Sequence, residues 1–178
     1  MAWIAGANVI TGDLITAAVW NNYLGATGSI EYLHDTRELY VPCTEWKDNS
    51  AGTYHTANTP SGYGCDINDV NDAAFMRFRV PLGFSAIVTA AIIVDPLITN
   101  ASANWDTYSL YGQDGEVVNT HSESDAVTTY NASINTYLAV NVAGIFTSLA
   151  AGDNVALRLK VGTTGHRVVV AGMYLQYS

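Results

Sequence analysis

Much of this chain alternates apolar and polar side chains with a period of two residues. In residues 75–80, aromatic and arginine side chains alternate with an apolar series made by Met76, Phe78 and Val80. A strand places every second side chain on the same face, whereas a helix would spread these positions around its circumference. The segment is therefore predicted to be a strand with one apolar face turned toward a core.

Segments of the same kind recur after residue 38, separated by stretches rich in Gly, Asn, Asp and Ser. The predicted strands are 39–43, 75–80, 86–94, 105–111, 137–142, 155–161 and 168–177. Residues 44–72 are interpreted as a long polar loop. Short strands at such spacing are typical of a mainly-β sandwich.

The composition excludes several classes of partner. Only 13% of the 178 residues are charged and the formal net charge is −9, so no basic surface is available to neutralise nucleic-acid phosphates. We expect no nucleic-acid partner and no membrane partner, because an anionic membrane surface would repel the chain. No signal peptide precedes the strands and no apolar run approaches the ~20 residues of a membrane span. Synthesis in a cytoplasm is therefore expected.

Residues 11–25 follow a different, helical pattern. Ile15 and Val19 lie four residues apart, and Gly25 can end the helix in the left-handed conformation. So short a helix is marginal alone in water, so its apolar side must pack on something else. We divide the chain into an arm with a short helix, 1–33, and a sandwich, 34–178. The expected attachment residues are Trp3, Ile4, Leu14, Ile15, Val19 and Trp20.

The closing segments carry a first resemblance. Residues 148–159 read as Leu149, two residues, Gly152-Asp153, then an alternating apolar strand, and 168–177 form a last strand containing Gly172. This order resembles the final strands of the tumour-necrosis-factor/C1q-like jelly roll. The resemblance implies a jelly-roll β-sandwich that assembles as a homotrimer.

The start of the chain carries a second resemblance. The segment 11–21, Thr-Gly-Asp-Leu-Ile-Thr-Ala-Ala-Val-Trp-Asn, is similar to the opening of small tailed-bacteriophage virion proteins. The resemblance implies a virion structural protein made in the host cytoplasm. Its most concrete form is a trimeric capsid decoration, or cement, protein whose partners are its own copies and the major capsid protein. The alternative is the receptor-binding head of a tail fibre, which would contact a host-surface glycan.

The sequence offers weak candidates for catalysis. A Ser/His/Asp triad could be drawn from His121, Ser122 and Asp125, but no nucleophile-elbow motif accompanies it. The carboxylate pair Asp114/Glu116 lies in a stretch better interpreted as a turn between strands, because Asp-Gly suits positive-φ positions. Glu123/Asp125 is a further pair. A glycan hydrolase, which needs two carboxylates across a sugar, remains the enzyme alternative, and we expect no enzyme.

Residues 66–72, Asp-Ile-Asn-Asp-Val-Asn-Asp, form the densest acidic and amide run. Such oxygen ligands can hold Ca²⁺, but a calcium loop starting at Asp66 would have Val70 at its fifth position, Asn71 at its sixth and Arg77 at its twelfth. The EF-hand pattern fails, so a solvated or capping loop is expected. We expect no metal and no cofactor.

The long loop 44–72 is expected on the surface, since a buried loop would leave backbone polar groups unpaired. Its aromatic residues Trp46, Tyr54 and Tyr63 are the predicted contact residues. Cys43 and Cys65 flank most of this loop. Two states stay open for them: free thiols, which a reducing cytoplasm maintains, or a disulfide formed after release from the cell.

Overall fold

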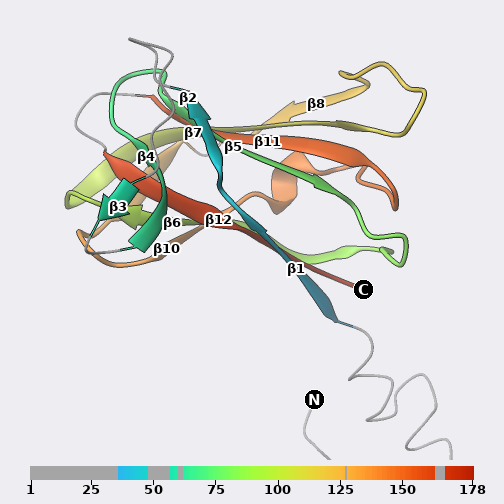
Figure 1. The fold of residues 1–178 in the computed structure, drawn as a ribbon, viewed down its shortest axis with the longest axis horizontal. Coiled ribbons are helices and arrows are strands. Elements are labelled where there is room, and N and C mark those ends of the chain that lie inside the picture. Colours follow the sequence, from blue (N-terminus) through green and yellow to red (C-terminus); the bar gives the residue numbers. More distant parts are fainter. Residues whose placement is uncertain (1–35, 48–56, 60–61, 127, 163–166) are drawn as a thin grey trace, which may run out of the picture.

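The computed structural model describes residues 36–47, 57–59, 62–126, 128–162 and 167–178. These residues form a sandwich of two antiparallel sheets, and their helical content is limited to a 3-10 turn, η1, at Ala143–Ile145 (Figure 1). No helix among them has the length and apolarity of a membrane span. The predicted helix at 11–25, the six predicted attachment residues of the arm and Tyr54 lie outside the described residues.

The first sheet is built around β12, the last strand of the chain. Along one edge β12 pairs with β6, and along the other with β4 at residues 168–170 and with β1 at residues 172–177. Two further strands pair with β6 and β4. The bounds are β10 (Leu138–Asn141), β6 (Ile87–Pro96), β12 (Val168–Tyr177), β4 (Gly62–Ile67), β3 (Ala57–Thr59) and β1 (Arg37–Pro42).

The second sheet also has six strands, with β11 and β7 at its centre. β5 and β7 flank β11 on its two sides, and β7 carries β8 and β9 on different parts of its other edge. In Figure 1 the β8 strand lies at the upper right of the sandwich. The bounds are β2 (Glu45–Lys47), β5 (Ala73–Arg79), β11 (Asn154–Val161), β7 (Asn100–Gly112), β8 (His121–Ser124) and β9 (Thr129–Ala132).

The core lies between the two sheets and is filled by alternate residues of their strands. On β11 every second residue from Val155 to Val161 is buried, and on β12 Met173 and Leu175 face them from the other layer. Burying one such side chain stabilises the fold by about 1.5–3 kcal/mol. The alternation seen in the sequence is therefore the alternation between core and solvent.

The sandwich and all seven predicted strands are confirmed, but the description of residues 44–72 as one loop is wrong. Its described parts contain β2, β3 and β4. The strands β8 and β9 were also missed. Four of these five strands have only three or four residues, which is too few for a hydrophobic period to be recognised. The fifth, β4, has six residues and does bury Cys65 and Ile67, a pattern that the interpretation as a polar loop overlooked.

Cys43 and Cys65 meet where β1 and β4 adjoin on the same edge of β12. The Cys43 N–H donates to the Ala171 carbonyl at 2.9 Å, and Cys65 is the strand partner of Val170. Both cysteines are buried free thiols. A hydrogen bond between the two thiols, together with burial, raises the pKa of Cys43 far above its usual range.

We predict that both thiols react slowly with a water-soluble aromatic disulfide reagent in the native protein, because the reactive species is an accessible thiolate. Two thiols per chain should react at once after unfolding in denaturant without reductant. Fast reaction of the native protein would contradict the burial. A count of zero in the unfolded chain would instead show that the two cysteines are bonded.

Gly172 allows β1 to approach β12 closely. A Cβ atom at this position would lie 2.4 Å from the Val41 carbonyl oxygen and 2.9 Å from the Tyr40 hydroxyl oxygen. Both distances are shorter than van der Waals contact, and the first involves backbone that cannot move without disturbing strand pairing. Position 172 therefore has no room for a side chain while β1 remains in place.

Gly172→Ala should lower the free energy of unfolding by about 1–3 kcal/mol, the usual cost of overpacking. Gly144→Ala is the matched control, since Gly144 is exposed and a Cβ there meets nothing within 4 Å. We expect the control to stay within about 0.5 kcal/mol of the parent. Urea unfolding followed by tryptophan fluorescence measures both, and equal stabilities would refute the steric account.

Candidate functional site

The outward side of the second sheet carries a mixed polar and aromatic surface, here called the cleft face. Because Val155, Leu157 and Leu159 of β11 point into the core, their neighbours point to solvent. Strand register then aligns outward residues in rows: Phe75, Arg158 and Tyr108 in one, and Arg77, Ala156 and Leu110 in the next. The cleft face comprises Glu45, Phe75, Arg77, Arg79, Asn154, Ala156, Arg158, Lys160, Asp106, Tyr108, Leu110, Ser122 and Ser124.

The turn between β7 and β8 makes this face concave. Its backbone folds back at Gly115, which has a φ of +93°, and the Gln113 N–H donates to Glu116 Oε2 at 2.7 Å. The turn and the sheet enclose a cleft of about 590 Å³. Leu110 and Ala156 lie in the sheet side of the cleft, and the exposed Val117 and Val118 lie in the turn side. The turn predicted at 111–116 is confirmed for residues 113–116, whereas Tyr111 and Gly112 are the last residues of β7.

Ion pairs hold the polar groups around this cleft. Asp114 accepts from Arg79 Nη2 at 3.3 Å and from Asn154 Nδ2 at 2.8 Å, which ties the turn to β5 and β11. Glu45 lies 3.7 Å from Arg77. All of these groups are exposed, so each pair contributes little to stability. Their importance is in fixing where donors and acceptors stand at the rim of the cleft.

Tyr108 and Arg158 occupy the row beside the cleft. The Arg158 guanidinium carbon lies 4.9 Å from the centroid of the Tyr108 ring, a cation–π contact. The Tyr108 hydroxyl is hydrogen-bonded to the Ser122 hydroxyl on β8. Arg158 Nε is buried and has no hydrogen-bond partner among the described residues. The row thus combines an aromatic ring, a hydroxyl pair and a cation.

Sequence reasoning missed Tyr108 and Arg158. Each lies in a correctly predicted strand, but only the register of β7 against β11 brings them together. The available signal was their position in the alternation, since both residues lie between buried neighbours. This alternation indicates that their side chains face outward, but it does not indicate which strands are neighbours.

The structure does not assemble the catalytic residues drawn from the sequence. His121 and Ser122 are consecutive in β8 and therefore point to opposite sides of the sheet. The His121 ring stacks on Tyr111 at 4.8 Å between centroids, whereas Ser122 contacts Tyr108 on the cleft face. A histidine on the opposite side cannot take the proton of the Ser122 hydroxyl, so the triad hypothesis is wrong.

Glu123 belongs to a structural network. Its carboxylate accepts from the Tyr111 hydroxyl at 2.5 Å and from the Thr147 N–H at 3.0 Å. Burial opposes ionisation of Glu123, but the hydrogen bonds from Tyr111 and Thr147 outweigh it and lower the pKa of this carboxyl. Glu123 is therefore an ionised carboxylate that fastens β8 to the segment after η1.

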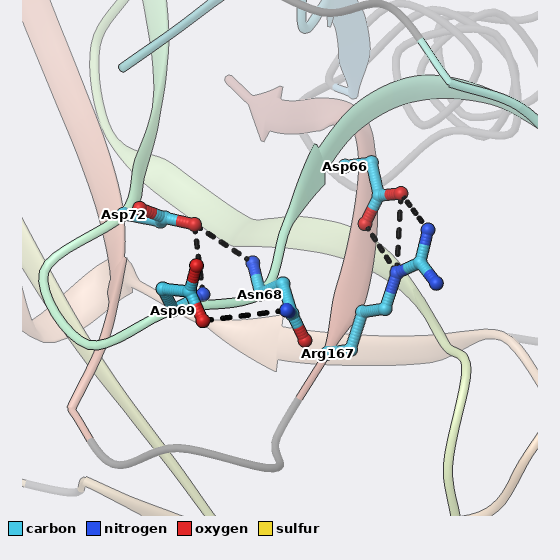
Figure 2. Close-up of polar contacts among 5 residues, drawn as sticks. All are labelled: Asp66, Asn68, Asp69, Asp72 and Arg167. Carbon is cyan, nitrogen blue, oxygen red and sulfur yellow. Dashed lines mark hydrogen bonds and ion pairs between the residues drawn. The ribbon is translucent and has the colours of Figure 1, made fainter. Parts of the chain in front are cut away.

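The carboxylates of the acidic run 66–72 accept hydrogen bonds from other groups of the protein (Figure 2). Asp66 receives two hydrogen bonds from Arg167 Nε, at 3.0 and 3.2 Å, while Asp72 Oδ2 accepts the backbone N–H groups of Asn68 and Asp69 at 3.1 and 2.8 Å. Figure 2 shows Asp66 turned to Arg167 and away from Asp72. Within the described part of the chain, no three His, Cys, Asp or Glu side chains are grouped to hold a metal.

The aromatic residues predicted as contacts in 44–72 and the outward side of the first sheet are two further candidate contact regions. The backbones of Trp46 and Tyr63 lie in β2 and β4, while their side chains, like Tyr54, lie outside what the structure describes. The outward side of the first sheet carries Tyr40 opposite Tyr174, with Gly172 and Ala139 in the adjacent row. This second aromatic surface is the competitor of the cleft face.

Comparison with known proteins relates the sandwich to carbohydrate-binding modules. No family model matches the chain, and no curated protein matches it. Among solved structures, a xylan-binding module, CBM15, has a TM-score of 0.50 at 10% identity and covers 80% of this chain and 97% of its own. The CBM36-1 domain of a multidomain xylanase from the hindgut metagenome of Trinervitermes trinervoides has a TM-score of 0.44 at 11% identity, with 80% and 98% covered.

A third structure, TmCBM61 in complex with beta-1,4-galactotriose, has a TM-score of 0.43 at 14% identity, covering 80% of this chain and 88% of its own. At such identities a likeness concerns the fold. The similarity to the xylan-binding module establishes that the described part of this chain is a jelly-roll β-sandwich.

Proposed function

We propose that this protein is a non-catalytic glycan-binding domain whose site is the cleft face. The observation that carries the proposal is the cleft of about 590 Å³ beside the Tyr108 and Arg158 row. The sandwich has the fold of a xylan-binding module, and this supports the same general activity.

The chemistry of the cleft suits a sugar. A sugar ring has apolar C–H faces and an equator of hydroxyl groups, so its site needs apolar surface next to fixed donors and acceptors. Leu110, Val117 and Val118 supply apolar surface, and Asn154 and Gln113 supply amides. Pockets with a few placed polar groups among apolar ones are the usual form of small-ligand sites.

The carboxylates of the cleft support binding without hydrolysis. Glycosidases use one carboxyl group as a proton donor and a second as a nucleophile or base. Asp114 is held by Arg79 and Asn154, and one Glu116 oxygen accepts from the Gln113 N–H within the turn. These contacts engage both side chains in holding the turn, where they shape the cleft.

Replacing Ala156 by Trp should abolish glycan binding, because the indole would fill the cleft from its sheet side without entering the core. Ala139→Trp is the matched control, since Ala139 is exposed on the outward side of the other sheet. Calorimetry with oligosaccharides that bind the parent should show at least a tenfold loss for the first variant alone. Loss in the control alone would move the site to the Tyr40 and Tyr174 surface.

We further propose that the domain works on a bacteriophage particle as the receptor-binding head of a tail fibre. The resemblance of residues 11–21 to phage virion proteins supports the setting, and a glycan site supports a receptor role over capsid decoration. In this proposal the arm joins a trimer of the domain to other virion proteins. A capsid decoration protein is the second candidate, supported by the same N-terminal resemblance.

Deleting residues 1–33 should leave a domain that folds and binds glycan but no longer incorporates into particles. The described core is built from residues between Leu39 and Tyr177, and the deletion removes the six predicted anchors. Particle incorporation can be measured by mass spectrometry of purified virions after complementation with parent or truncated protein. A truncated chain that incorporates normally would refute the role of the arm, and hundreds of copies per particle would favour decoration.

A further inference from the structure

Positive charge is concentrated on the cleft face of a strongly acidic chain. Four of the seven Lys and Arg residues, Arg77, Arg79, Arg158 and Lys160, lie on the outward side of β5 and β11, although the chain has a net charge of −9. The question is which of these cations is already neutralised by a neighbouring carboxylate.

Three of the four are paired within the protein. Arg77 lies 3.7 Å from Glu45 and Arg79 lies 3.3 Å from Asp114. Lys160 Nζ lies 3.0 Å from Asp106 Oδ2, and both of these side chains are partly buried. Glu45, Asp114 and Asp106 are thus each matched to one cation.

Arg158 is the exception. Among the described residues no carboxylate lies within ion-pair distance of it, and its buried Nε has no hydrogen-bond partner. Its contact is with the Tyr108 ring. A ring face attracts the cation but cannot satisfy the directional N–H donors of a guanidinium. The terminal nitrogens of this guanidinium, unlike its Nε, are not buried. They are the atoms of an uncompensated cation, in the middle strand of the sheet, that an anion from outside can reach.

We propose that the glycan bound by this face carries a carboxylate, as a uronic acid does, and that Arg158 binds that carboxylate. This inference rests on the proposed function and specifies its ligand class. A guanidinium binds a carboxylate through two parallel hydrogen bonds, so it recognises both the charge and its orientation. Ser122 and Ser124 lie on β8, on the far side of β7 from Arg158, and their hydroxyls face the same side of the sheet as the Tyr108 ring.

The spacing along β11 fits an oligosaccharide. Ala156 lines the cleft, and Arg158 follows it by two residues on the same side, about 6.8 Å along the strand. That length is comparable to one sugar unit. One sugar would occupy the cleft while the next, acidic, sugar reaches Arg158.

Matched ligands test the proposal directly. Oligogalacturonates and oligoglucuronates can be compared with their carboxyl-reduced counterparts, which have a primary alcohol in place of each carboxylate. The full-length protein should bind at least one acidic oligosaccharide at least tenfold more tightly than its reduced counterpart in calorimetry. Arg158→Gln should bring the ratio of the affinities for the acidic and the reduced ligand close to one. Arg158→Lys should give an intermediate ratio, because lysine keeps the positive charge but cannot donate two parallel hydrogen bonds.

Arg37→Gln is the control for net charge, because Arg37 is exposed on β1 of the other sheet. It should keep the parent's preference for the acidic ligand. Thermal unfolding of each variant checks that the fold is intact. Equal binding of acidic and reduced ligands by the parent would overturn the carboxylate inference and leave glycan binding standing. Binding of no oligosaccharide, acidic or neutral, would overturn the proposed function itself.

Discussion

Backbone pairing along both edges of β12 is the constraint on which the rest of the first sheet depends. One edge is used by β6, and the other is shared by β4 and β1, which meet near Ala171. The same meeting point brings Cys43 and Cys65 together and requires the bare backbone of Gly172. The first sheet is therefore assembled from segments that are far apart in the sequence. Its β12 strand shifts register against β6 between Val170 and Gly172, at the point where β4 gives way to β1 on the other edge.

The second sheet shows how a core determines a surface. The inward side of β11 is uniformly apolar because it faces the first sheet. With those positions fixed, Ala156 and Arg158 must face outward, and register places them beside Leu110 and Tyr108. The turn after β7 then bends over this face and is tied down through Asp114. The candidate site is a consequence of strand register together with one anchored turn.

The residues of that site differ in how far the sequence could reveal them. The alternation in 75–80 correctly assigned Arg77 and Arg79 to an outward face, and the Asp-Gly pair correctly indicated a turn, which begins after Gly112. The hypothesis of a triad at His121 and Ser122 failed because it relied on closeness in sequence, while neighbours in a strand point apart. Residues 66–72 were expected to form a solvated or capping loop. Asp66 and Ile67 instead end β4, whereas Asp72 caps the rest by accepting backbone N–H groups of its own segment.

The sequence by itself determined the fold class, the seven predicted strands and, in 75–80 and 155–161, the side of the strand that enters the core. These properties depend on local alternation of apolar side chains, which is written in consecutive residues. Only the tertiary structure decided which strands are neighbours, that the short edge strands exist, and that Arg158 lies over Tyr108 without a carboxylate partner. The physical reason is that backbone hydrogen bonds between strands are nearly independent of side chain, so register is chosen by the packing of the whole sandwich.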